Sequence, residues 1–175
     1  MASNAGVADV FGGEGRDRIK GFGAVNVLRG EGDNDTIVAT GGDNKIYGGA
    51  GGDALTGRGG RNLMRGEDGR DTLKAYGAWN DVDGGADDDV MRGFGAYNNL
   101  NGGSGDDRIF GLGAENALIG GAGDDRIDAI GAVSSAWGGA GDDRIRATGG
   151  VNDLRGEAGA DVLIGGEGND RLYGQ

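Results

Sequence analysis

The sequence predicts an all-β parallel solenoid built from 18-residue coils. Counting in nines from Asp17 reaches Asp or Asn at every step to Asp170, with one Ser at 134 and no insertion or deletion. The 175 residues include 44 glycines and no proline, a composition typical of tight turns and short strands. A nine-residue unit can bury its apolar residue only against copies of itself. We therefore expect a single domain of stacked coils over residues 1–175.

The strands are predicted from the eighth position of each unit, which carries one large apolar residue between polar neighbours. Units with Asp at position six alternate with units that have Asn there, so one full coil holds two turns and two short strands. Equivalent strands of successive coils should pair in parallel and form two thin facing sheets, in about nine and a half coils. We expect a degenerate half-repeat over 3–11, alternating Asp-type and Asn-type half-repeats over 12–164, and a terminal Asp-type half-repeat over 165–175.

Composition excludes several classes of function. The chain has no Cys and no His, which removes disulfides, thiolate metal sites and the usual general base. Its carboxylates are too numerous for any pair to stand out as acid and base, so we do not expect an enzyme. The formal net charge of −12, with 17 basic residues diluted by 29 acidic ones, argues against nucleic acid, and no apolar stretch suggests membrane insertion. A strongly acidic chain of this kind is expected to bind cations.

The Asp corner is the candidate metal site. Nine carboxylates stacked at about 5 Å intervals would repel one another or take up protons. Calcium would resolve this conflict, because it accepts six to eight oxygen ligands in flexible geometry and a glycine-rich turn can present backbone carbonyls beside each carboxylate. The expected ligands are Asp17, Asp35, Asp53, Asp71, Asp89, Asp107, Asp125, Asp143, Asp161 and Asp170, with turn carbonyls near Gly12, Gly30, Gly48, Gly66, Gly84, Gly102, Gly120, Gly138, Gly156 and Gly165.

The unit G-G-x-G-x-D-x-(apolar)-x resembles the repeat of the RTX, or repeats-in-toxin, family along nearly the whole chain. Clean copies occupy 12–20, 102–110, 120–128, 138–146 and 165–173. The resemblance implies a right-handed parallel β-roll that holds about eight Ca²⁺ between successive Asp turns. It also implies a bacterial protein that is secreted or displayed at the cell surface, with type I secretion as the expected route. The strict spacing is broken where Glu31, Glu67 and Glu157 replace the second Gly and where Asp33, Asp68 and Asp87 alter the turn; the other turn acids, among them Asp88, Asp106, Asp124 and Asp142, are expected to be solvated.

The Asn corner lacks the acidic residue, so we expect no calcium there and a ladder of stacked amides instead. Its turns carry apolar residues such as Tyr76, Trp79, Phe94 and Tyr97. If these point outward, they form a contact surface for sugar rings or for another copy of the chain. If they point inward, they widen a thin core. The sequence leaves both possibilities open.

The two ends carry no obvious capping element, and bare strand edges favour pairing with other chains. Asp170 lies in a complete Asp-type turn but falls on the Asn corner, so a second copy rotated by half a turn would place its Asp17 turn above Asp170. We therefore expect a calcium-binding structural protein that assembles head to tail into a fibre, surface layer or matrix, with a calcium site shared by Asp170 and Asp17. The alternative is a calcium-dependent folding and secretion module of a larger RTX toxin, enzyme or adhesin, with carbohydrate a possible ligand of the aromatic row.

Overall fold

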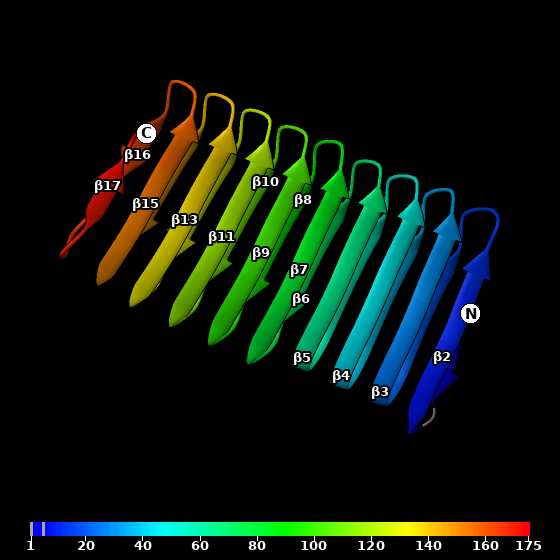
Figure 1. Cartoon of the computed structure of the whole chain (residues 1–175). Coiled ribbons are helices and arrows are strands. Elements are labelled where there is room, and N and C mark those ends of the chain that lie inside the picture. Colours follow the sequence, from blue (N-terminus) through cyan, green and yellow to red (C-terminus); the bar gives the residue numbers. More distant parts are fainter. Residues whose placement is uncertain (1, 5) are drawn as a thin grey trace.

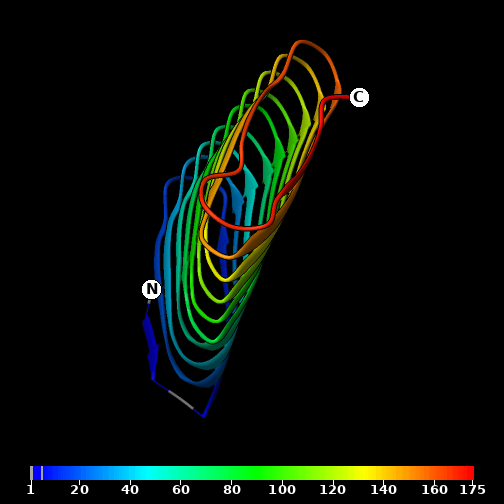
Figure 2. The same cartoon turned by 90° about the vertical axis from the view of Figure 1, so that its left-hand side faces the viewer.

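The computed structural model describes residues 2–4 and 6–175 as a parallel β-roll of about nine 18-residue coils, which confirms the predicted fold. Successive coils lie side by side along the rod, and their strands run in the same direction (Figure 1). Seen from the end, each coil is a flattened loop stacked on the previous one (Figure 2). The strands are β1 (Ala2–Asn4), β2 (Val7–Gly13), β3 (Arg18–Gly32), β4 (Thr36–Ala50), β5 (Ala54–Asp68), β6 (Thr72–Tyr76), β7 (Trp79–Ala86), β8 (Val90–Phe94), β9 (Tyr97–Ser104), β10 (Arg108–Leu112), β11 (Glu115–Ala122), β12 (Arg126–Ile130), β13 (Val133–Ala140), β14 (Arg144–Thr148), β15 (Val151–Ala158), β16 (Val162–Ile164) and β17 (Arg171–Tyr173).

Strand pairing keeps an exact 18-residue register, so each residue lies beside its counterpart in the next coil. Ile109 pairs with Ile127, and Ile127 pairs with Ile145. Most strands are longer than three residues, and β3, β4 and β5 each continue through the Asn corner. Main-chain bonds between coils also extend into the turns, as in the bond from the Gly77 N–H to the Phe94 carbonyl at 3.0 Å. The backbone ladder therefore surrounds most of the coil.

The core consists of the two predicted columns at position eight. Its side chains are buried from end to end of the rod, and the small residues Ala39, Ala75, Ala129 and Ala147 complete it. The column members are Ile19, Leu28, Ile37, Ile46, Leu55, Met64, Leu73, Val82, Met91, Leu100, Ile109, Leu118, Ile127, Ala136, Ile145 and Leu154. One apolar residue per strand is a thin core, so the buried polar columns at the two corners must contribute to stability.

The Asn column confirms the predicted amide ladder. From Asn26 to Asn116, each Nδ2 donates to Oδ1 of the Asn in the next coil at 2.8–2.9 Å. The ladder weakens at Ser134, whose Oγ lies 3.4 Å from Asn116 Nδ2. Beyond this point the buried Oδ1 of Asn152 has no hydrogen-bond partner. The shorter Ser side chain therefore breaks the ladder between the coils on either side.

Replacing Ser134 with Asn should restore the ladder and stabilise the calcium-bound roll by about 1–2 kcal/mol, because a buried amide oxygen would gain its missing donor. The neighbouring core residue Ala136 is also smaller than its counterparts in the other coils. Urea unfolding in saturating calcium would measure the change. The control is Ser135→Asn, at a half-buried position that faces outward, and it should leave the free energy of unfolding unchanged. A Ser134→Asn variant no more stable than this control would contradict the explanation.

Candidate metal centre

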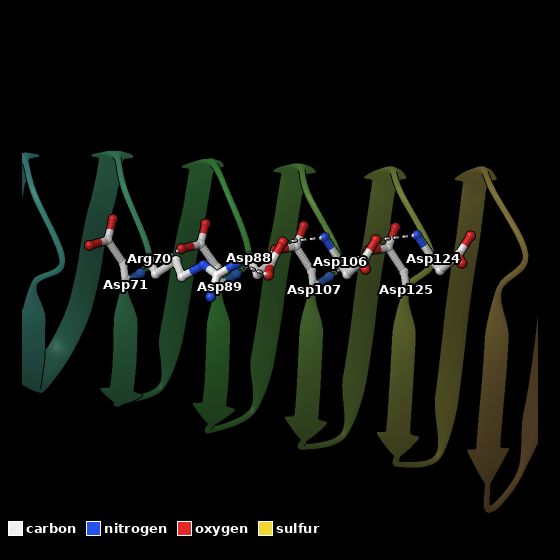
Figure 3. A network of polar contacts seen from close by, with 8 residues as sticks. All are labelled: Arg70, Asp71, Asp88, Asp89, Asp106, Asp107, Asp124 and Asp125. Atoms are coloured by element: carbon white, nitrogen blue, oxygen red, sulfur yellow. Dashed lines mark hydrogen bonds and ion pairs between the residues drawn. The ribbon is translucent and has the colours of Figure 1, made fainter.

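The structure places the Asp column inside the turn, where the side chains are shielded from solvent. Asp35, Asp53, Asp71, Asp89, Asp107, Asp125 and Asp143 are only 1–3% exposed. Asp17 and Asp161, at the two ends of the column, are partly exposed. The predicted residues therefore form one continuous row along the rod, and part of it is seen in Figure 3.

The two oxygens of each carboxylate have different environments. Oδ1 accepts a hydrogen bond from the backbone N–H of the Asp in the preceding coil, at 2.7–3.0 Å along the whole column. Oδ2 is buried without any hydrogen-bond partner at eight of the rungs. An unpartnered buried carboxylate oxygen is costly, and a native structure requires something to satisfy it.

From Asp35 to Asp143, each free Oδ2 faces the first glycine of its own turn, together with a main-chain carbonyl from the next coil. At Gly102, a Cβ would lie within 3.0 Å of both Asp107 Oδ2 and the Gly120 carbonyl oxygen. The same two kinds of oxygen converge at eight glycines, Gly12, Gly30, Gly48, Gly66, Gly84, Gly102, Gly120 and Gly138. Two acceptors facing one another without a donor fit a cation that prefers oxygen ligands.

Burial raises the pKa of the column carboxyls, and the neighbouring carboxylates raise it further. The pKa is raised to about 8 at Asp71, to about 7 at Asp89, Asp107 and Asp125, and to about 6 at Asp53. It is also raised at Asp35 and Asp143. Desolvation is the largest cause, and the backbone N–H bond to Oδ1 opposes it only in part. Without a cation, the column therefore holds protons at a pH where free aspartate is ionised.

The ligand set of one rung is small. Among the described residues, no three acidic side chains gather around a common point. A Ca²⁺ ion would therefore be held by Oδ2 of the column Asp and by main-chain carbonyls of the glycine-rich turns of adjacent coils. The donor chemistry, which is oxygen only, fits calcium, and the bound ion would supply the positive charge that the buried carboxylates lack.

The turns that depart from the strict spacing keep the backbone of the glycine turns. Glu31, Glu67 and Glu157 have φ of 83°, 80° and 74°, and Asp33 and Asp87 have φ of 65° and 72°. Non-glycine residues adopt this left-handed region at a cost of about 1–2 kcal/mol each. The turns of these rungs are therefore strained, although their Asp residues at position six lie in the same column as the others.

A second row of acids was not expected to have a structural role. Asp88, Asp106, Asp124 and Asp142, here called the outer Asp row, precede the column residues directly. Each Oδ1 accepts the backbone N–H of the next coil at 2.8–3.0 Å. Figure 3 shows the carboxylates of Asp88, Asp106 and Asp124 lying along the rod toward the following coil. Asp88 also pairs with Arg70 at 2.7 Å. The sequence shows acids at both position five and position six of these turns. It does not show that the first side chain is exposed and the second is buried inside the turn.

The aromatic residues of the Asn corner point outward, which decides between the two possibilities that the sequence left open. Trp79 is 48% exposed and Tyr97 is 44% exposed, with their ring centroids 5.5 Å apart. Tyr76 and Phe94 stack at 4.9 Å and 6°. Arg58 and Arg61 lie over the rings of Tyr76 and Trp79. The result is a partly exposed aromatic ladder along the rod.

The terminal turn behaves as an Asp rung placed on the Asn column. Oδ1 of Asp170 accepts the backbone N–H of Asn152 at 3.0 Å and its side-chain Nδ2 at 2.8 Å. The first bond has the same form as every bond along the Asp column. Among the described residues, no group donates to the Asp17 carboxylate at the other end of the roll. Asp170 therefore has the hydrogen-bonding geometry of a column Asp, although it lies on the Asn corner.

Comparison with known proteins identifies the repeat. A family model described as the RTX calcium-binding nonapeptide repeat (4 copies) matches residues 4–37, 29–64, 56–91, 93–129 and 146–175. No curated protein and no solved structure matches the chain. No described helix is long and apolar enough to span a membrane. RTX repeats bind Ca²⁺ along their Asp-rich turns, where the structure places the buried Asp column. Because the matches cover well over half of the sequence, the chain belongs to the family of RTX calcium-binding nonapeptide-repeat proteins.

Proposed function

We propose that the chain is an extracellular structural protein that folds on Ca²⁺ and assembles head to tail. The observation that carries the proposal is the buried Asp column, in which eight carboxylate oxygens have no partner. Eight convergent pairs of carboxylate and carbonyl oxygens support about eight ions along this corner. Because cytosolic calcium is low, the chain would stay unfolded inside the cell and fold after export. RTX repeats are typical of secreted bacterial proteins, which agrees with this role.

Head-to-tail assembly is supported by the terminal rungs. A second copy rotated by half a turn about the rod would place its Asp17 carboxylate over the Asp170 backbone N–H, as in every internal rung. The shared rung would hold a Ca²⁺ ion between the copies. Such a contact uses different surfaces on the two copies and does not close, so it produces a fibre.

A second candidate is a module of a larger toxin, secreted enzyme or adhesin that binds carbohydrate. A shallow hollow of about 310 Å³ lined by Trp79, Tyr97, Asn99 and Glu115 favours it. The parallel stack of Tyr76 on Phe94 favours it less, because their ring faces cover one another and a sugar would meet mainly ring edges.

A calcium titration of the metal-free chain, followed by circular dichroism and negative-stain imaging, tests the proposal. We expect strand signal and filaments to appear together in the wild type. Asp170→Asn should fold at the same calcium concentration but form no filaments, because the junction loses its charged ligand. Glu167→Gln, in the same terminal turn, is the matched control and should still form filaments. A wild-type chain that folds with calcium but stays monomeric by light scattering would refute the assembly while leaving calcium binding intact.

A further inference from the structure

Basic residues gather on one face of this acidic molecule, which the sequence did not lead us to expect. In the strands that follow the turns of the Asp corner, the side chains at positions seven and nine face outward. Between residues 18 and 164, these positions hold eight of the 17 basic residues and only one acid, Asp128. This face is therefore rich in basic residues although the chain as a whole is acidic. The basic members are Arg18, Lys20, Lys74, Arg92, Arg108, Arg126, Arg144 and Arg146.

Three consecutive coils carry this charge in regular order. Each contains the sequence Asp-Asp-Arg-Ile, at 106–109, 124–127 and 142–145. The second Asp and the Ile are buried, and the first Asp and the Arg are exposed. Because exposure alternates along the chain, the exposed pair lies on the same outer side of the coil. A column of three acids therefore runs directly beside a column of three arginines, here called the arginine row.

The arginine row is electrostatically unfavourable in a single copy. Arg108 is the register partner of Arg126, which is the register partner of Arg144. Like charges directly opposite one another on neighbouring strands are destabilising. Arg126 pairs with Asp128 at 3.1 Å, but no described carboxylate forms an ion pair with Arg108 or Arg144. Arg108 and Arg144 are therefore available to an external partner that carries negative charge.

The adjacent acids are fixed in place and equally unpaired. Oδ1 of Asp106, Asp124 and Asp142 is held by the backbone N–H of the next coil. The bond to Asp106 is drawn in Figure 3. None of the three acids makes an ion pair with a described cation. Both columns repeat at the spacing of the coils. We call this surface the charge stripe; it consists of Asp106, Asp124 and Asp142 together with Arg108, Arg126 and Arg144. Half of its charged groups are acidic, and they are held in a regular order along the rod.

We propose that the charge stripe is a self-complementary interface that pairs two parallel copies of the chain. A two-fold axis parallel to the rod, passing between the two columns, places the acidic column of each copy over the arginine row of the other. Each of the three rungs then forms two ion pairs. The reverse orientation, with antiparallel rods, would place acid on acid. The contact uses the same patch on both copies and closes as a dimer.

A second copy fits this surface better than an anionic polymer does. The spacing of its charges equals that of the stripe, because both are set by the same coil. Guanidinium groups can also donate two parallel hydrogen bonds to one carboxylate. A polyanion lying along the arginine row would instead meet the acidic column one residue away and be repelled by it.

The test uses two triple variants and their mixture, all in calcium and in the Asp170→Asn background so that end-to-end assembly is absent. In the glutamate variant, Arg108, Arg126 and Arg144 become Glu. In the asparagine variant, Asp106, Asp124 and Asp142 become Asn, which keeps the acceptor for the backbone N–H. Sedimentation of the parent should show a dimer whose dissociation constant rises at least about tenfold between about 0.05 M and about 0.5 M NaCl. Each variant alone should be monomeric, and an equimolar mixture should form a heterodimer.

The control variant replaces Arg29, Lys45 and Arg65 of the opposite sheet with Glu, which changes the net charge equally, and it should dimerise like the parent. A monomeric parent at low salt would overturn the proposal, as would dimers formed by the glutamate variant alone. A parent that stays monomeric but binds heparin would identify an anionic polymer as the partner instead. The pairing depends only on a folded roll, so filaments that fail to form would leave it standing.

Discussion

Without calcium, the chain should be unfolded at about pH 8 and should gain strand structure as the pH falls toward about 4. Burial raises the pKa of five column carboxyls to between about 6 and about 8, from 3.8 in the unfolded chain. The folded state therefore binds more protons than the unfolded state across this window. This contribution to stability is complete below pH 3.8 and is lost as the pH rises through about 8.

Ordinary domains are stable by only about 5–15 kcal/mol, and every one of these column carboxyls has its pKa shifted in the same direction. Ionising the column without metal therefore opposes the fold at each of these rungs. Calcium should reverse the pH dependence, because the ion competes with protons for Oδ2 and binds more tightly as the pH rises.

Circular dichroism from pH 8 to pH 4, in a chelator and in millimolar calcium, would measure both effects. Sedimentation would separate folding from precipitation near the isoelectric point of about 4.3. As a control, Asp107→Asn with Asp125→Asn neutralises two rungs, so the metal-free variant should fold at a higher pH than the wild type and bind fewer ions. A wild-type chain that is folded at pH 8 in the chelator would contradict the proposed role of the column.

The features predicted from sequence are those that point into the coil. Position eight gives the apolar columns, and position six gives the Asp and Asn columns, because an inward side chain meets only its copies in neighbouring coils. Asn80, for example, bonds to Asn98 as an 18-residue period requires. A periodic sequence fixes such contacts without knowledge of the three-dimensional structure.

The outward positions could not be predicted in the same way. Whether Trp79 faces solvent or the core depends on the path of the Asn turn, and apolar content does not specify that path. The outer Asp row was expected to be merely solvated, because a hydrogen bond to the next backbone N–H leaves no mark in residue type. The arginine row was hidden by the overall charge of −12, which averages over faces that the fold separates.

Replacing Gly102 with Ala should destabilise the calcium-bound roll by about 3 kcal/mol or more and remove at least one ion. The backbone of this glycine is not left-handed, so the effect is steric. A methyl group would lie against both Asp107 Oδ2 and the Gly120 carbonyl oxygen. The carboxylate could rotate away only by leaving its place in the column, and the carbonyl belongs to the paired backbone of the next coil. Overpacking against fixed atoms usually costs about 1–3 kcal/mol, and here the lost cation adds to it.

Gly57 provides the matched control at the equivalent position of the Asn corner. The nearest atoms to a methyl group there belong to the Asn62 side chain, and no main-chain carbonyl is among them. Its register partners Ala39 and Ala75 already carry that methyl group in the neighbouring coils. Gly57→Ala should therefore unfold within about 1 kcal/mol of the wild type in calcium and bind the same number of ions. If urea unfolding and calcium titration gave equal losses for the two variants, the glycine would be needed only for tight coiling. A loss confined to Gly102→Ala would instead assign the space beside each first glycine of the Asp corner to the carboxylate and its ion.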